Sequence, residues 1–187
     1  MALSTTEALD NFVSEYVTPD NLERHRVAYD SLWPSICYDL KDVENAESEN
    51  IKDGTLVLWA PKKQNVSLSF DNVSKAMGIE LNKAFCDYFT RYFSNNLFAR
   101  APQGRCELLQ VWNESDFERL QQNLIGHLLM KQRLNQRPTL FFGITDEDDF
   151  ILSVINETGE VALEQVGKEP TKILASSLPE FLTQLSI

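Results

Sequence analysis

The sequence predicts an α/β protein of the α+β kind, in which a central mixed, largely antiparallel β-sheet is flanked by helices in one domain over residues 1–187. The main observation is a long amphipathic stretch that stands between two short apolar segments. Asn113 is a good cap for its start and Ser115 is a rival one, and Pro138 ends it. Short apolar segments joined by tight turns follow it, which is typical of antiparallel strands. Amphipathic helices with capping boxes are predicted near both ends of the chain.

The N-terminal part contains one clear helix and one irregular region. Ser4 and Glu7 form a capping box, and apolar residues at helical spacing predict a helix that ends before Pro19. Residues 20–53 contain apolar anchors without a clear period. Their last part, residues 42–53, is polar and acidic, and it is either a solvated loop or a binding surface.

The middle of the chain is predicted to alternate between strands and helices. Residues 55–60 form a strand, and residues 65–70 form either a second strand or an extended lead-in. Asp71 can cap a helix that carries Val73, Ala76 and Met77, and Gly78 ends this helix. Residues 80–93 form an aromatic-rich helix, whose aromatic stripe we expect to pack in the core.

The long helix after Asn113 is predicted to be the central element, with a hairpin of residues 96–101 and 105–112 ahead of it. From Leu124 onward its apolar residues cover more than half of the circumference, so we expect other elements to cover it from most sides. Gly126 lies roughly opposite the apolar face. It indicates either a close approach by another backbone or a tolerated glycine.

The last part of the chain is predicted to be a meander followed by a helix. Residues 139–144, 150–155 and 160–166 form strands, and residues 146–149 form an acidic turn between the first two. A second capping box at Ser177 opens the final short helix.

Composition excludes several classes of protein. No run of about 18 apolar residues is present, and the N-terminus lacks the features of a signal peptide, so we expect no membrane span. The three cysteines are scattered, which predicts reduced thiols in a cytoplasm. The net charge of −11 argues against nucleic acid and anionic lipid as partners. It is compatible with a basic protein partner, or with solubility alone.

No catalytic or metal-binding signature is present in the sequence, so we expect no enzyme, no cofactor and no metal site. His127 stands without a partner at a fixed spacing, and Cys106 has no visible base. The turn at residues 146–149 lacks the alternating spacing of a calcium loop. A hydrolase that uses His127 or Cys106 is therefore a minor hypothesis.

Negative charge is concentrated in three separate stretches, which are the acidic loop, the start of the long helix and the 146–149 turn. The candidate partner-binding residues in them are Asp42, Glu44, Glu47, Glu49, Glu114, Asp116, Glu118 and Asp146. If folding brings two stretches together around a concavity, the result is a groove with a focused negative potential. Asp116 and its acidic neighbours also serve as candidates for capping the helix.

The long helix and the segments around it carry a specific set of motifs, which includes Leu108-Leu-Gln, Trp112, Asp116-Phe117, Arg119, Gln121, Asn123-Leu-Ile-Gly-His-Leu128, Pro138-Thr-Leu-Phe141 and Glu180-Phe-Leu. In these residues the chain resembles the Syd family, bacterial proteins that interact with SecY, the channel subunit of the protein translocase. The resemblance covers residues 105–186 closely and continues more weakly toward the N-terminus. The loop at residues 42–53 matches the family poorly.

This resemblance implies a compact fold similar to the SUKH group of immunity-type proteins, with an acidic concave surface that binds basic cytoplasmic loops of SecY. It implies a protein held on the cytoplasmic side of the bacterial inner membrane by SecY, which monitors SecY assembly or restrains a faulty translocase. We expect a monomer that neither inserts into the membrane nor binds nucleic acid. An immunity-like inhibitor of a toxin is the alternative that the fold kinship suggests.

Overall fold

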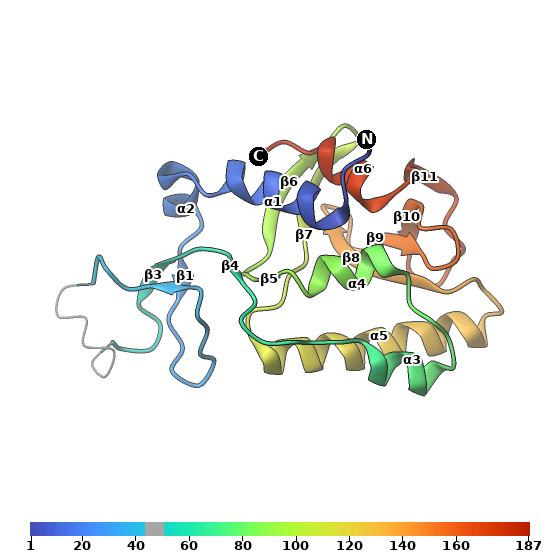
Figure 1. Ribbon diagram of the computed structural model, residues 1–187, viewed down its shortest axis with the longest axis horizontal. Helices are drawn as coiled ribbons and strands as arrows, with labels where there is room; N and C mark the ends of the chain where they lie inside the picture. The colour runs from blue at the N-terminus through green and yellow to red at the C-terminus, as the bar shows by residue number, and fades with distance from the viewer. Residues whose placement is uncertain (44–50) are drawn as a thin grey trace.

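The computed structural model describes residues 1–43 and 51–187, and its elements form an α+β fold (Figure 1). The helices are α1 (Thr5–Tyr16), α2 (Pro19–Arg24), α3 (Asp71–Met77), α4 (Lys83–Phe89), α5 (Glu114–Arg133) and α6 (Leu178–Thr183). The strands are β1 (Val27–Ala28), β2 (Tyr38–Asp39), β3 (Leu56–Trp59), β4 (Lys62–Lys63), β5 (Tyr92–Phe93), β6 (Leu97–Ala101), β7 (Gly104–Leu108), β8 (Thr139–Thr145), β9 (Phe150–Ile155), β10 (Val161–Gln165) and β11 (Lys172–Ala175).

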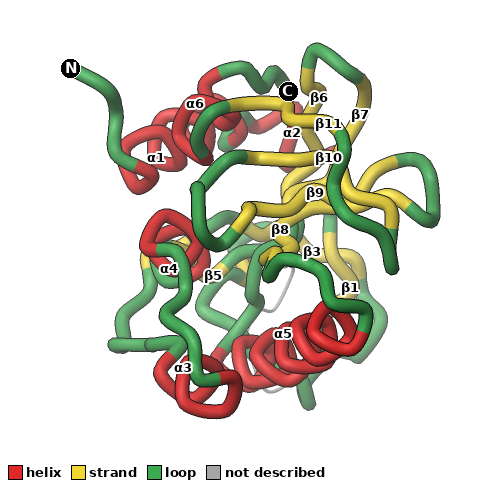
Figure 2. Tube along the Cα trace, turned by 90° about the vertical axis from the view of Figure 1, so that its right-hand side faces the viewer, coloured by secondary structure: helices red, strands yellow, loops and turns green. Residues whose placement is uncertain are grey.

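The main sheet has six antiparallel strands in the order β11-β10-β9-β8-β7-β6. Successive strand residues point to opposite faces, so β8 shows what covers each face. Phe142 packs against Phe181 of α6 and Tyr88 of α4, with ring centroids 5.7 Å apart in both pairs. Its neighbour Phe141 packs against His127 of α5 at 5.4 Å. Helices α4 and α6, with α1 packed on them, therefore cover one face, and α5 covers the other (Figure 2). The predicted largely antiparallel sheet flanked by helices is confirmed.

The aromatic segment at residues 80–93 packs in the core as predicted, but it is not one helix. Phe85, Tyr88 and Phe89 are fully buried on α4. The helix ends at Phe89, and the chain continues into β5, which pairs with β4. The side-chain amide of Gln64 donates to the carbonyls of Phe89 and Tyr92, at 2.9 and 3.0 Å. These bonds satisfy carbonyl groups that a longer helix would have used internally.

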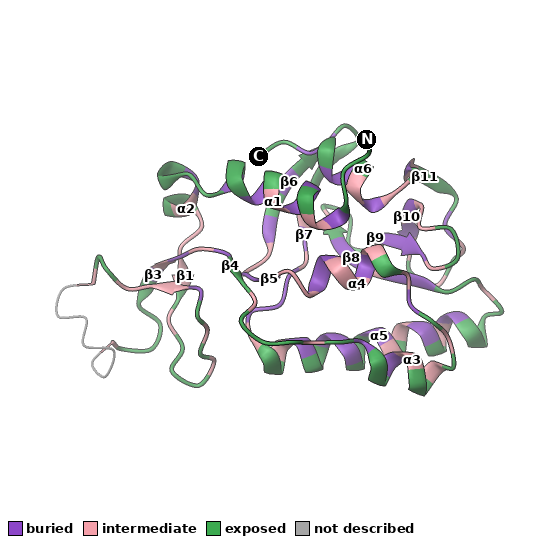
Figure 3. Ribbon diagram, viewed as in Figure 1, coloured by how far each residue is buried: buried purple, intermediate pink, exposed green. Residues whose placement is uncertain are grey.

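The expectation that α5 is covered from most sides is wrong, because α5 is an amphipathic helix at the surface (Figure 3). Its buried face carries Phe117, Leu124 and Leu128. Leu129, which made the apolar face look wide, is 39% exposed. Gly126 is exposed, and a Cβ atom placed on it would meet nothing within 4 Å, so it is a tolerated glycine.

The predicted strand boundaries before α5 also need a correction. The strand expected to reach residue 112 ends at Leu108. Beyond it, Val111 forms an isolated bridge to Phe93, and its carbonyl accepts a hydrogen bond from the Ser94 amide at 2.9 Å. The chain thus leaves the main sheet here and crosses to β5, a long-range pairing that periodicity does not reveal. Residues 65–70 contain no strand and are the lead-in to α3.

A small three-stranded sheet in the order β1-β3-β2 lies apart from the main sheet (Figure 1). We call residues 27–43 and 51–60, which contain it, the arm. Strands β1 and β2 have two residues each and pair with β3 antiparallel. Elements this short produce no period in the sequence, and their partners lie about 20 to 30 residues away along the chain. For the same reason, β1 and β2 were not predicted.

A buried ion pair fixes the end of α5 to the main sheet. The Lys131 ammonium group donates to Glu164 at 2.7 Å and to the Lys168 carbonyl at 2.9 Å. The other carboxylate oxygen of Glu164 accepts from the Ser153 hydroxyl at 2.7 Å. The Lys131 and Glu164 side chains are at most 1% exposed. Both charges are therefore compensated by hydrogen bonds, as buried charges must be.

Candidate functional site

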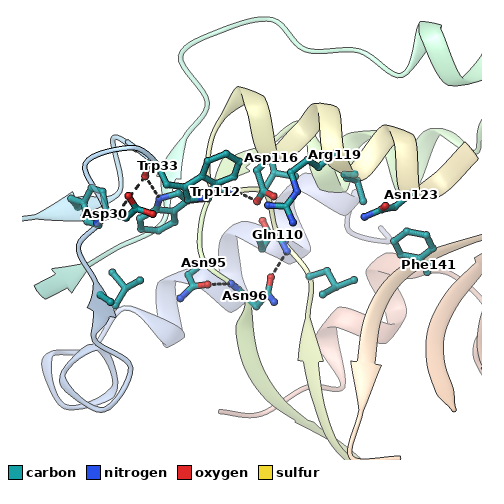
Figure 4. A pocket seen from close by; sticks show the side chains of 16 residues that line it. Asp30, Trp33, Asn95, Asn96, Gln110, Trp112, Asp116, Arg119, Asn123 and Phe141 are labelled. Carbon is teal, nitrogen blue, oxygen red and sulfur yellow. Dashed lines mark hydrogen bonds between the residues drawn. The ribbon is translucent and has the colours of Figure 1, made fainter. Parts of the chain in front are cut away.

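A cavity of about 420 Å³ lies between the arm, the start of α5 and the chain on either side of the β6–β7 hairpin (Figure 4). We call it the arm cavity. Its walls come from β1 and residues 30–38 of the arm, from Asn95 and Asn96 before β6, from residues 109–112 before α5, and from the first half of α5. Phe141 of the main sheet contributes as well.

Hydrogen bonds between two segments far apart in the sequence hold the arm against the start of α5. The indole nitrogen of Trp112 donates to the Trp33 carbonyl at 3.2 Å. The Ser35 hydroxyl donates to the Trp112 carbonyl at 2.6 Å. The side-chain nitrogen of Asn113 donates to the Pro34 carbonyl at 2.8 Å, while its oxygen caps α5 by accepting from the Asp116 amide at 2.8 Å. The predicted cap of α5 is confirmed, and the same residue fixes the position of the arm.

Aromatic side chains form much of the cavity wall. Tyr38 lies edge-on to Trp112, with ring centroids 5.0 Å apart. The Tyr38 hydroxyl donates to the Trp33 carbonyl at 3.4 Å and accepts from the Asp30 amide at 3.1 Å. Burial raises the pKa of Tyr38, so the phenol stays neutral at physiological pH. The wall therefore contains a neutral, hydrogen-bonded phenol that packs against the Trp112 ring.

Three charged residues line the cavity in the described part of the chain, two acidic and one basic. Asp30 accepts from the Leu32 amide at 2.8 Å through one carboxylate oxygen. Asp116 accepts from the Trp112 amide at 2.8 Å, also through one oxygen. Arg119 places its guanidinium carbon 5.5 Å from the ring centroid of Trp33. An acidic site with aromatic walls is suited to a cation, because the face of an aromatic ring attracts positive charge.

The structure places the helix-start residues around the base of the arm. Asp116 lines the arm cavity. Glu114 lines a neighbouring cavity of about 320 Å³, which shares Trp112 as a wall. Glu118 is exposed on α5.

The other predicted partner-binding residues divide between the arm and the opposite end of the hairpin. Asp42 is exposed on the arm. The hydrogen bond from Arg26 to Glu23 raises the pKa of Arg26, and the charge of Asp42 raises it more weakly. Asp146 lines separate cavities of about 160 and 260 Å³ near the turn between β6 and β7. Glu44, Glu47 and Glu49 lie outside the described residues. Among described residues, the arm and the helix start share one cavity, which Asp146 does not line.

Comparisons with known proteins identify the family of this chain. A family model described as "Syd protein (SUKH-2)" matches residues 6–186. The chain belongs to the Syd family. It is 63% identical over 186 residues to Protein Syd of Alteromonas mediterranea, a match that covers 100% of this chain and 98% of the relative. It is 39% identical to Protein Syd of Pseudoalteromonas atlantica, covering 99% and 97%, and 43% identical to that of Colwellia psychrerythraea, covering 97% and 92%.

Several cavity residues of this Syd-family chain were missed by sequence reasoning. Asp30, Tyr38 and Arg119 were not singled out as site residues. Trp33 lies in the irregular region of residues 20–53, and Trp112 was expected at the end of a strand. The available signal was the density of aromatic residues between 29 and 38, but without a period it gave no position in space.

His127 and Cys106, the two residues considered for catalysis, are largely buried within the fold. The Nε2 atom of His127 lies 2.9 Å from the Thr139 hydroxyl, and burial lowers the pKa of the imidazole. Burial raises the pKa of the Cys106 thiol to about 11, so it is protonated and weakly nucleophilic at neutral pH. Within residues 1–43 and 51–187, no group of three His, Cys, Asp or Glu side chains could hold a metal ion. The relatives are named Protein Syd, a name that states no enzymatic activity.

The helices within residues 1–43 and 51–187 differ from what a membrane-spanning helix requires. None of the described helices combines the length and apolar character that crossing a bilayer requires.

Proposed function

We propose that this Syd-family protein binds basic cytoplasmic segments of the translocase channel subunit SecY at the arm cavity. In this proposal it is a non-enzymatic, monomeric protein held on the cytoplasmic side of the bacterial inner membrane by SecY. It monitors the assembly of SecY or restrains the translocase. The observation that carries the proposal is that Asp30, Asp116 and several aromatic side chains line one cavity. The net charge of the chain is −11.

Electrostatics supports this choice of partner. Cytoplasmic loops of membrane proteins carry an excess of Lys and Arg. The cytoplasmic leaflet itself is acidic, so it repels a protein with this net charge. A basic loop that extends from the membrane therefore attracts the protein, whereas bare lipid does not.

The proposed binding surface extends from the cavity over its acidic surroundings. Asp42 and Glu118 are exposed and contribute long-range attraction, and Glu114 extends the surface into the neighbouring cavity. The proposal also includes Glu44, Glu47, Glu49 and Asp146. Asp146 lines other cavities, so in this proposal it contributes through its field.

The test is co-sedimentation with inner-membrane vesicles that contain overproduced SecY, compared with vesicles that lack it. Asp30→Asn removes one of the two negative charges of the cavity but keeps an oxygen that can accept from the Leu32 amide. Asp148→Asn makes the same charge change in the exposed 146–149 turn and is the matched control. We expect Asp30→Asn to weaken binding about two- to fivefold, the range for one exposed charge pair. Equal effects of both variants would contradict a role for the cavity.

Salt provides a second readout of the same assay. Binding should fall steeply as ionic strength rises to about 0.5 M, where the screening length is only about 4 Å. Binding that does not change over this range would contradict the electrostatic mechanism.

A second candidate function is inhibition of a toxin in the manner of an immunity protein. It is favoured by the description of the matching family model, which includes SUKH-2. Affinity purification from the native cell distinguishes the two. Recovery of a toxin in place of a translocase subunit would favour this second function.

A further inference from the structure

Arg119 is an unexpected residue in the arm cavity. Its guanidinium group lies over Trp33 in a cavity whose other charged walls, among described residues, are Asp30 and Asp116. Arg119 is itself exposed, and it forms no ion pair within residues 1–43 and 51–187. The long side chain is therefore held in the cavity mainly by the aromatic face and by the general negative field.

The surroundings of this guanidinium are those of a binding site for a cation. An arginine stacks on an aromatic face through its planar, weakly hydrated head group. In the described part of the chain, Asp30 and Asp116 each leave one carboxylate oxygen without a hydrogen bond from the protein. These oxygens are suitable acceptors for a second, better placed guanidinium group.

An anionic ligand fits the cavity less well than a cation. Arg119 alone would attract it, while Asp30 and Asp116 would repel it. The aromatic wall also presents ring faces, which carry negative potential.

We propose that the arm cavity is the subsite for one arginine side chain of the partner's basic segment, and that Arg119 occupies this subsite until the partner displaces it. This inference rests on the proposed function and specifies its central contact. Two guanidinium groups cannot share one ring face and two carboxylates without repulsion. Arg119 is therefore an internal competitor, and it lowers the apparent affinity for the partner by the fraction of time it occupies the site.

The test uses a synthetic peptide of alternating arginine and glycine as the probe, with titration calorimetry at physiological salt. Arg119→Ala should bind the peptide more tightly than wild type by about two- to fivefold, the range for an exposed cation–aromatic contact. Arg133→Ala is the matched control, because Arg133 is also exposed on α5 but lies at its other end. It removes the same charge without freeing the cavity. Equal gains in both variants, or weaker binding by Arg119→Ala, would overturn the inference.

Trp33 allows a second, independent measurement. Trp33→Ala removes the aromatic surface that holds either guanidinium, so it should weaken peptide binding. In the Trp33→Ala background, the additional change Arg119→Ala should raise the affinity for the peptide no more than Arg133→Ala does. An undiminished gain would mean that Arg119 acts through its charge alone and does not occupy the subsite. Circular dichroism and urea unfolding verify that each variant is folded.

The same variants on SecY vesicles separate this inference from the proposed function. If the protein binds the vesicles in a SecY-dependent manner, but Arg119→Ala and Arg133→Ala behave alike toward both the peptide and the vesicles, the function stands and the inference fails. A second outcome is that Arg119→Ala gains affinity for the peptide, but neither wild type nor any variant binds vesicles with SecY better than vesicles without it. In that case the arginine subsite stands and SecY is the wrong partner.

Discussion

At the scale of single residues, Asn113 connects local structure to the candidate site. The sequence predicts it as the cap of a helix, because capping depends on neighbours within four positions. Its second bond, to Pro34 across 79 residues, could not be predicted, since nothing in the local pattern encodes it. The same limit applies to Arg119, whose place over Trp33 depends on how the arm folds back.

Asn113 should therefore matter more to stability than an ordinary helix cap. Asn113→Ala removes the cap and the contact with the arm, and we expect it to lower the free energy of unfolding by about 1 to 2 kcal/mol. Ser115→Ala changes an exposed residue in the same turn and should stay within about 0.5 kcal/mol of wild type. Urea denaturation measures both. An Asn113→Ala protein as stable as the Ser115→Ala protein would show that these bonds contribute little.

The buried pair of Lys131 and Glu164 leads to a second prediction at this scale. Glu164→Gln leaves the Lys131 ammonium group buried without a counter-charge, which should cost about 3 to 5 kcal/mol in urea denaturation. Adding Lys131→Met removes that charge and should recover much of the loss. Glu169→Gln disrupts an exposed pair with Arg137 and should cost less than about 1 kcal/mol. Additive losses in the Lys131→Met, Glu164→Gln double variant would contradict this explanation.

At the scale of elements, the sequence predicted the helices whose start depends on residues close together in the chain. The capping box of α1 and the caps of α5 and α6 are present as expected. The predicted second capping box is only half formed, because Glu180 accepts from the Ser176 amide and not from the amide of the cap residue Ser177. The elements that it missed, β1 and β2, exist through pairing with β3. The width of the apolar face of α5 was misjudged because Leu129 lies at the edge of the buried face, where residue type alone does not decide exposure.

An ion pair between elements predicts a specific dependence on pH. Hydrogen bonds from Arg91, on the chain that enters β5, and from Tyr92 help lower the pKa of Asp10 on α1 to about 2. A lowered pKa in the folded state means that the stabilisation is complete above about pH 4 and is lost as the pH falls toward 2. Asp10→Asn should thus reduce the free energy of unfolding by about 1 kcal/mol at pH 6, after allowance for solvent screening, and by much less at pH 2.5.

The control for Asp10 is Asp148→Asn, in an exposed turn. Its unfolding free energy should follow that of wild type at both pH values. A constant difference between wild type and Asp10→Asn from pH 6 to pH 2.5 would mean that Asp10 stabilises the fold by packing and not by its charge.

At the scale of the whole molecule, the sequence predicted the sign of the charge and the family, but not where the charges meet. The structure brings the arm and the start of α5 around one cavity and leaves Asp146 on other cavities. That arrangement depends on tertiary contacts between residues 33–35 and 112–113, which no periodicity contains.

Binding in the arm cavity should therefore change the dynamics of two distant segments together. A bound arginine peptide bridges the arm and α5, so amides in residues 33–39 and 110–119 that exchange through arm opening should become protected. At a peptide concentration about 100 times the dissociation constant, their exchange should slow about 100-fold. Residues 146–149 should be unaffected. Hydrogen exchange with mass spectrometry measures this, and a glutamate–glycine peptide of the same length is the control. Protection confined to residues 146–149 would instead place the basic segment at the β6–β7 end of the sheet.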